Sequence, residues 1–304
     1  MSWILLVLLP PLIVVLVPLV NEWRKPRMAG RWRAGAPGDM AALSMGATHF
    51  RWHGPADAAK TAVCVHGLTT PSFVWDGVAE RLVAQGYRVL VYDLYGRGYS
   101  DRPAGAQTRA FFLTQLEELI AHEGITGEFT LVGYSMGGSI ATCFAAKHPD
   151  RVRRLVLVAP AGLGHVTPPF GRFCIAVPGI GDWLFRALFP TSFRRAARKM
   201  TRNEGIPAEV SAAQVAEVEM RGFVPAVLSS MRGMLAETLE TEHRAIAATG
   251  MPVLAIWATR DATIPIKNMG RLATWNRTAQ QAQVEGATHW APITHPDEVA
   301  RAMR

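Results

Sequence analysis

The sequence is poor in cysteine, with three among its 304 residues: Cys64, Cys143 and Cys174. No two of them form a Cys-x-x-Cys pair, so neither a disulfide framework nor a zinc site is indicated. Internal repeats and low-complexity runs are also missing, which excludes repeat architectures. Cys64 and Cys143 lie in apolar stretches, where cysteine is typically a buried core residue.

A long basic run is missing as well, although the formal net charge is +8. The basic residues lie beside apolar segments, for example within 24–33 and 194–202. This pattern favours a membrane-facing surface over a DNA-binding stripe. We therefore expect no nucleic-acid partner.

The first apolar segment, "WILLVLLPPLIVVLVPLV", covers residues 3–20. As a helix it would be about 27 Å long, close to the hydrocarbon thickness of about 30 Å. A cleaved secretory signal is the alternative, but no positive charge precedes the run and no small-x-small cleavage site follows it. We expect an uncleaved anchor at 1–21 and a basic linker at 22–42. The five Lys and Arg residues between 21 and 40 then predict a cytoplasmic catalytic domain.

Beyond the linker, short apolar runs alternate with helix-like stretches. The runs occupy residues 61–65, 88–92, 129–133, 154–159 and 252–258. Continuous apolar runs fit strands that are buried on both faces of a parallel sheet. The alternation predicts an α/β fold with a mostly parallel sheet flanked by helices, and residues 43–54 are expected to add one or two antiparallel edge strands.

More than 90 residues separate the runs at 154–159 and 252–258, far more than one crossover needs. We expect the excess, residues 162–245, to form an inserted helical cap that is rich in Phe and Met. The core of the fold would then consist of residues 43–161 and 246–304. Because open α/β sheets bind ligands at the carboxyl ends of their strands, part of the cap should line a pocket there.

The stretch Gly133-Tyr134-Ser135-Met136-Gly137 matches G-x-S-x-G, the nucleophile elbow. It follows an apolar run and opens a helix-like stretch, which is the strand–turn–helix setting that this motif requires. The turn strains the serine backbone, and the two glycines avoid clashes that a Cβ would cause. We expect the Ser135 hydroxyl to stand at the N-terminal end of a helix.

A serine nucleophile needs a base, and the base needs a carboxylate that orients it. Asp261 follows the run at 252–258, and His289 follows a weaker strand candidate at 282–286. In the fold of this motif the order is serine, acid, histidine, so both candidates should meet Ser135 at one edge of the sheet.

Rival residues have simpler interpretations. Asp93 also ends a strand, but it precedes the serine and is explained as a turn-stabilising carboxylate. His66 precedes Gly67 and is expected to shape its own loop, while His49 has no strand-end setting. The developing oxyanion needs two donors; we expect the backbone N–H groups of Met136 and Leu68, with Thr69 as the alternative to Leu68.

Six stretches together resemble the α/β-hydrolase superfamily, serine hydrolase branch, over about residues 43–304. They are "VHGLTTPSFVW", "VYDLYGRGYSD", "LVGYSMGGS", "LVLVAPAG", "ATRDATIP" and "GATHWAPITHP". The resemblance implies Ser135 as nucleophile, Asp261 as acid and His289 as base, with Leu68 and Met136 donating to the oxyanion. It also implies hydrolysis without a metal or an organic cofactor.

In this superfamily the dehalogenase and epoxide-hydrolase branches carry Asp at the elbow. By this resemblance, Ser135 excludes both branches. We expect an esterase or monoacylglycerol-lipase-like enzyme that cleaves a lipophilic or lipid ester through an acyl-enzyme on Ser135. The alternatives are carbon–carbon bond hydrolysis or acyl transfer on the same triad, and a non-catalytic binding protein tethered to the membrane. The oligomeric state is left open by the sequence.

Overall fold

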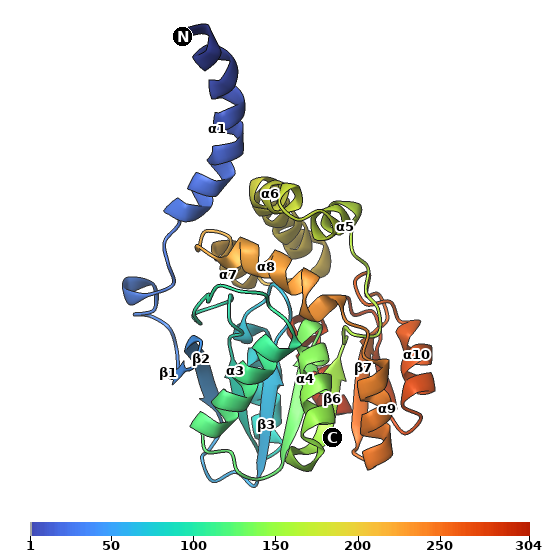
Figure 1. Ribbon diagram of the computed structural model, residues 1–304. Coiled ribbons are helices and arrows are strands. Elements are labelled where there is room, and N and C mark those ends of the chain that lie inside the picture. Colours follow the sequence, from blue (N-terminus) through green and yellow to red (C-terminus); the bar gives the residue numbers. More distant parts are fainter. Residues whose placement is uncertain (1) are drawn as a thin grey trace.

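Eight strands form one sheet, in the order β1-β2-β4-β3-β5-β6-β7-β8, in the computed structural model (Figure 1). The structure describes the backbone of residues 2–304 and the side chains of residues 13–304. The strands are β1 (Asp39–Leu43), β2 (Gly46–His53), β3 (Lys60–Val65), β4 (Tyr87–Tyr92), β5 (Phe129–Tyr134), β6 (Val152–Val158), β7 (Val253–Ala258) and β8 (Gln280–Val284). β1 and β2 are antiparallel to their neighbours, and β3 to β8 are parallel. The predicted mostly parallel sheet is confirmed.

The central strands are buried on both faces, as their continuous apolar runs predict. Every residue of β5 and of β7 is buried. Four helices cover one face of the sheet: α3 (Arg109–His122), α4 (Met136–Lys147), α9 (Glu240–Thr249) and α10 (Asn268–Trp275). α2 (Asp76–Ala84) and α12 (Pro296–Ala302) pack on the other. Because β3 to β8 are parallel, their carboxyl ends lie at one common edge of the sheet.

Between β6 and β7 the chain leaves the sheet and forms further helices, which confirms the predicted helical insertion. We call α5 (Pro169–Ala176), α6 (Ile180–Glu204), α7 (Ala208–Glu217) and α8 (Phe223–Arg232) the cap. Figure 1 shows these helices as a layer stacked on one end of the sheet. The cap has its own apolar core, in which the rings of Phe185 and Phe189 stack at 4.4 Å between centroids.

The prediction of an N-terminal membrane anchor is wrong. The chain begins with α1 (Ser2–Arg24), but among the residues that the structure describes no helix is long and apolar enough to cross a membrane. The side chains of residues 1–12 of the predicted anchor lie outside the described part. α1 ends in a polar turn that contains Glu22 and Arg24. The cytoplasmic location inferred from an anchor, with secretion as its alternative, therefore loses its basis.

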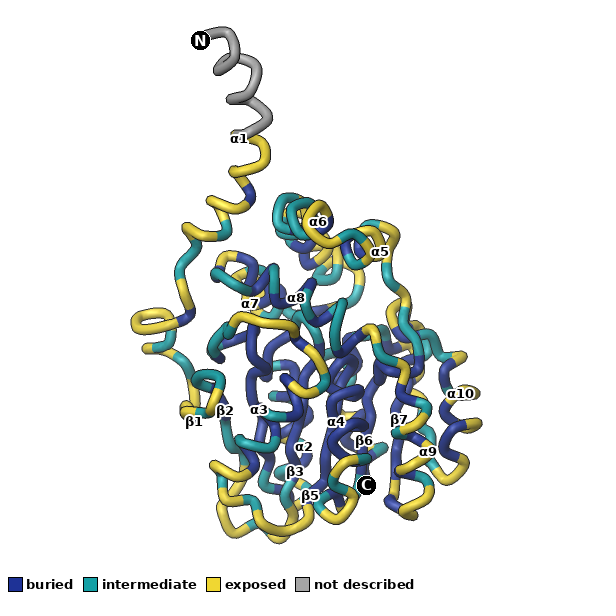
Figure 2. The backbone as a smooth tube through the Cα atoms, in the orientation of Figure 1, coloured by how far each residue is buried: buried dark blue, intermediate teal, exposed yellow. Residues whose placement is uncertain are grey.

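The segment after α1 runs along the cap and then along the core (Figure 2). The Arg221 N–H at the end of the α7–α8 turn donates to the Pro26 carbonyl at 2.9 Å. Farther along, Arg33 Nε donates to the Tyr99 carbonyl at 2.7 Å. This stretch consequently contacts both the cap and the loop that follows β4.

Candidate active site

Ser135 stands in the tight turn between β5 and α4. Its backbone has a φ of 53° and a ψ of −120°, a strained conformation for a residue with a side chain. A Cβ on Gly133 would lie 2.4 Å from the Gly137 carbonyl oxygen, and one on Gly137 would lie 2.1 Å from that of Val65. Gly133 therefore lets β5 pass close to the first turn of α4, and Gly137 lets that turn pass close to the end of β3.

Ser135, His289 and Asp261 form one chain of hydrogen bonds. His289 Nδ1 lies 2.7 Å from Asp261 Oδ2, and His289 Nε2 lies 3.0 Å from Ser135 Oγ. A carboxylate can only accept, so Nδ1 carries the proton and Nε2 is free to accept from the serine hydroxyl. The structure thus brings together the three side chains that the sequence analysis selected, from the ends of β5, β7 and β8.

Backbone groups fix the orientation of the Asp261 carboxylate. Its Oδ1 accepts from the N–H groups of Thr263 at 2.7 Å and Ile264 at 2.8 Å. Oδ2 is thereby left to face His289. The turn "DATI" after β7 therefore aims this side chain.

Tyr134, the residue before the serine, also holds the histidine. Its hydroxyl donates to the His289 carbonyl at 2.9 Å, and the two rings lie 5.1 Å apart. The role of Tyr134 is not predictable from the sequence, because the x position of the motif carries no signal of a contact 155 residues away. Its place directly before the nucleophile is the only local signal.

The two expected oxyanion donors lie beside Ser135. Met136 is the first residue of α4, where backbone N–H groups have no partner within the helix. Leu68 belongs to the loop after β3 and lines the same cavity as Ser135. That loop packs against the serine, since a Cβ on Gly67 would lie 3.2 Å from the Cβ of Ser135.

His66 fixes the loop that carries Leu68. Its Nε2 accepts from the Leu94 N–H at 2.8 Å, so its Nδ1 carries the proton and donates to the Gly67 carbonyl at 2.8 Å. Burial lowers the pKa of His66 to about 4. The ring is therefore neutral at pH 7 and acts on its own loop, as its position in the sequence indicates.

A cavity of about 240 Å³ opens over Ser135 and His289, between the sheet edge and the cap. Most of its wall is apolar and comes from the core, from the segment before the cap and from α8: Leu68, Ala161, Val166, Pro168, Met231, Leu235, Ile264 and Trp290. Such a mostly apolar cavity with a few convergent polar groups is typical of a small-molecule site. Within the described residues no group of His, Cys, Asp and Glu side chains could hold a metal ion.

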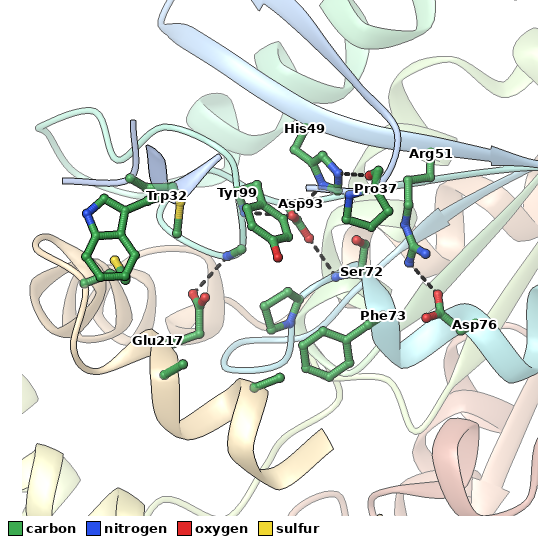
Figure 3. A pocket seen from close by; sticks show the side chains of 16 residues that line it. Trp32, Pro37, His49, Arg51, Ser72, Phe73, Asp76, Asp93, Tyr99 and Glu217 are labelled. Atoms are coloured by element: carbon green, nitrogen blue, oxygen red, sulfur yellow. Dashed lines mark hydrogen bonds and ion pairs between the residues drawn. The ribbon is translucent and has the colours of Figure 1, made fainter. Parts of the chain in front are cut away.

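A second cavity, of about 370 Å³, is lined by residues 71–73 of the loop that carries Leu68 (Figure 3). Asp93 lines it and accepts from the N–H groups of Ser72 at 2.8 Å and Tyr99 at 2.9 Å. Its Oδ2 also lies 2.7 Å from His49 Nδ1. Burial opposes ionisation of Asp93, but the hydrogen bond and the charge of His49 outweigh it and lower the pKa of Asp93 to about 2. Asp93 therefore stabilises the turn, and Ser135 does not line this cavity.

Comparison with known proteins places this geometry in context. A family described as alpha/beta hydrolase fold matches residues 61–296. The 2-hydroxymuconate semialdehyde hydrolase of Pseudomonas sp. (strain CF600) is 31% identical over 218 residues, which cover 70% of this chain and 74% of the relative. Lipase 1 of Psychrobacter immobilis is 24% identical, over 80% of this chain and 75% of the relative.

Solved structures agree with the fold. A thermophilic esterase from Thermogutta terrifontis superposes with a TM-score of 0.72, covering 88% of this chain and 97% of that one at 24% identity. At this level of identity the likeness shows the fold alone. The sequence-based resemblance to this superfamily is confirmed by the match to the family.

Proposed function

We propose that this chain, which belongs to the alpha/beta hydrolase family, is a serine hydrolase that cleaves a carboxylic ester with a lipophilic acyl or alcohol part. The observation that carries the proposal is the hydrogen-bonded chain from Asp261 through His289 to Ser135, which opens on an apolar cavity. A serine hydroxyl aligned with an imidazole that a carboxylate orients is the arrangement that acyl transfer requires.

In the proposed reaction, His289 Nε2 takes the proton of Ser135 Oγ as the oxygen attacks the ester carbonyl. The N–H groups of Leu68 and Met136 donate to the oxyanion of the tetrahedral intermediate. The intermediate collapses, and His289 gives its proton to the departing alcohol, which leaves an acyl-enzyme on Ser135. A water molecule then loses its proton to His289, attacks the acyl carbonyl and releases the acid, while the proton returns to Ser135. Asp261 stays ionised and stabilises the imidazolium in both halves.

The cavity wall supports a lipophilic substrate. Met231 from the cap, with Leu235, Ile264 and Trp290 from the core, offers apolar contacts close to Ser135. Burial of each additional CH₂ group contributes about 0.8 kcal/mol. We therefore expect kcat/KM to rise along an ester series until the acyl chain fills the cavity.

The test is a substrate series assayed against a dead control. Purified protein should cleave p-nitrophenyl esters with acyl chains from C2 to C16 and should be labelled by a fluorophosphonate probe at Ser135, whereas Ser135→Ala should do neither. A protein that resists the probe and cleaves no ester is not a serine esterase. Hydrolysis that falls steadily from C2 upward would contradict the lipophilic part of the proposal alone.

Carbon–carbon hydrolysis is the second candidate, because the 2-hydroxymuconate semialdehyde hydrolase is similar over 70% of the chain. The same three residues would serve it. Assaying 2-hydroxymuconate semialdehyde beside the esters separates the two: a kcat/KM at least about 100-fold higher on the dienoate than on every ester would favour this second function.

A further inference from the structure

Arg97, in the loop after β4, is a buried cation that the triad does not use. Its side chain is fully buried, and no carboxylate of the described residues lies within 4.0 Å of it; Glu217 pairs with Arg102 instead. Burial lowers the pKa of Arg97 to about 9, so the guanidinium is still charged at pH 7. Burying a charge without a counter-ion costs free energy, and hydrogen bonds to the buried group have to offset this cost.

All five N–H groups of Arg97 have neutral acceptors, and these lie on two different bodies of the fold. On the core side, Nε donates to the Leu68 carbonyl and Nη1 to the Tyr95 carbonyl, both at 2.9 Å. On the cap side, Nη2 donates to Ser230 Oγ at 2.8 Å and reaches the Ala226 carbonyl at 3.5 Å. Arg97 therefore connects helix α8 of the cap to the loop of the expected oxyanion donor.

Gln107 closes this network. Its Oε1 accepts from Arg97 Nη1 and also from Ser230 Oγ, the latter at 2.5 Å. Both Gln107 and Ser230 are buried. The rigid, planar guanidinium is thus held at several points, so a shift of Ser230 has to be accommodated by Arg97.

The contacts of Leu68 make its backbone sensitive to Arg97. The peptide before Leu68 is fixed by His66, which donates to the Gly67 carbonyl, and the peptide after it is fixed by Arg97. The direction of the Leu68 N–H depends on both. At the cap end of the network, Ser230 precedes Met231, whose side chain lines the cavity over Ser135.

We propose that Arg97 is a positioning residue that couples filling of the apolar cavity to the alignment of the Leu68 N–H with the oxyanion. The role rests on the proposed ester hydrolysis. An acyl chain packed against Met231 presses on α8, Ser230 transmits the contact to Arg97, and Arg97 holds the Leu68 carbonyl. Long substrates therefore gain in kcat as well as in binding.

Arg97→Lys tests the role directly, because it keeps the charge and loses the fork that reaches both bodies. Loss of one oxyanion donor typically lowers kcat by 10²- to 10³-fold, and a misaligned donor should lower it by about 10- to 100-fold with KM changed less than about threefold. Active sites are counted by fluorophosphonate titration, so unfolded protein does not enter kcat. The inhibition constant of butylboronic acid, which forms a tetrahedral adduct with serine, should rise by a similar factor.

Ser230→Ala is the second variant, since it removes one contact on the cap side and leaves the charge in place. The ratio of kcat on p-nitrophenyl laurate to kcat on p-nitrophenyl butyrate should fall about fivefold. The matched control is Arg232→Lys in the same helix: among the described residues this arginine bonds within the cap, to Asp182 and to the carbonyls of Cys174 and Ile175.

Three results decide the matter. If Arg97→Lys keeps the wild-type kcat per labelled site, or if both Ser230→Ala and Arg232→Lys shift the laurate-to-butyrate ratio equally, Arg97 is merely structural and the proposal is wrong. If Arg97→Lys does not fold, the ratio in Ser230→Ala decides alone. If the wild type neither reacts with the probe nor cleaves either ester, the proposed function itself fails and the role of Arg97 fails with it.

Discussion

Two His–Asp pairs in this molecule have the same geometry and opposite chemistry. His289 Nδ1 lies 2.7 Å from Asp261, and His49 Nδ1 lies 2.7 Å from Asp93. The difference is at the other ring nitrogen. Nε2 of His289 faces a serine hydroxyl at 3.0 Å, whereas Nε2 of His49 faces the Pro37 carbonyl at 2.5 Å.

A carbonyl and a carboxylate are both acceptors, so His49 must carry a proton on each nitrogen. Burial acts against this charge, but the contacts with Asp93 outweigh it and raise the pKa of His49. The pair is therefore a buried ion pair with no proton to exchange. Nε2 of His289 faces a hydroxyl that can donate to it, so the partner of the second nitrogen, and not the His–Asp distance, separates a candidate base from a structural tie.

The largest test of this contrast substitutes each histidine. His289→Ala should lower kcat by about 10⁴-fold or more, because members of a triad act as a unit. His49→Ala should instead cost about 3–5 kcal/mol of unfolding free energy, since it leaves Asp93 buried without its counter-charge. Esterase rates per fluorophosphonate-labelled site, together with urea unfolding, measure both effects. Equal loss of kcat in the two variants would remove the distinction.

The two aspartates provide the second test. Asp261→Asn should lower kcat by about 10³- to 10⁴-fold, because an amide N–H₂ facing Nδ1 favours the wrong tautomer of His289. Asp93→Asn should leave kcat per labelled site within about threefold and destabilise the fold, because an amide cannot accept from Ser72, Tyr99 and His49 together. A stable Asp93→Asn protein would show that the second pair is not an ion pair.

Much of this arrangement was predictable because its signals are local. The runs at 88–92 and 129–133 became β4 and β5 with shifts of at most one residue, and the weak run at 282–286 corresponds to β8 at Gln280–Val284. Asp261 and His289 could be selected because a parallel sheet brings the carboxyl ends of its strands together. The order serine, acid, histidine along the chain was then enough to predict a role for each of the three residues.

The contacts that join distant segments had no such signal. His49 was set aside for lack of a strand end, yet it lies beside Asp93, 44 residues away, because β2 pairs antiparallel with β4. Arg97 meets Ser230 only through the packing of α8 on the core. The anchor was predicted from the apolar run alone, and among the described residues no helix is long and apolar enough to cross a membrane.

A third test concerns the carboxylate that shares the second cavity with Asp93. Glu217 accepts from Gly98 N–H at 2.9 Å and pairs with Arg102, but burial raises its pKa from 4.5 to about 7, with Asp93 adding to the rise and Arg102 and Arg97 opposing it. The folded state therefore binds more protons than the unfolded chain between pH 4.5 and 7. The unfolding free energy should fall as the pH rises through this window, by about 3 kcal/mol at most, and above the window Glu217 should add nothing further to its pH dependence.

Urea unfolding at pH 5 and pH 8 measures this slope. Glu217→Gln should flatten it, so that the variant gains relative to the wild type as the pH rises. Glu209→Gln, at an exposed position of the same helix, is the control and should keep the wild-type slope. A steeper fall in Glu217→Gln would mean that Glu217 is ionised throughout, as Asp93 is.

The smallest effect sharpens the contrast at its catalytic end. Tyr134→Phe removes the hydroxyl that donates to the His289 carbonyl at 2.9 Å and leaves the ring in place. A hydrogen bond of this kind contributes about 1 kcal/mol. If the bond keeps His289 aligned between Asp261 and Ser135, kcat/KM should fall about fivefold. The unfolding free energy should change by a similar small amount, far less than in His49→Ala. His49 is fixed through acceptors at both ring nitrogens, whereas Nε2 of His289 faces Ser135. An unchanged kcat/KM in Tyr134→Phe would show that Asp261 alone aligns the base.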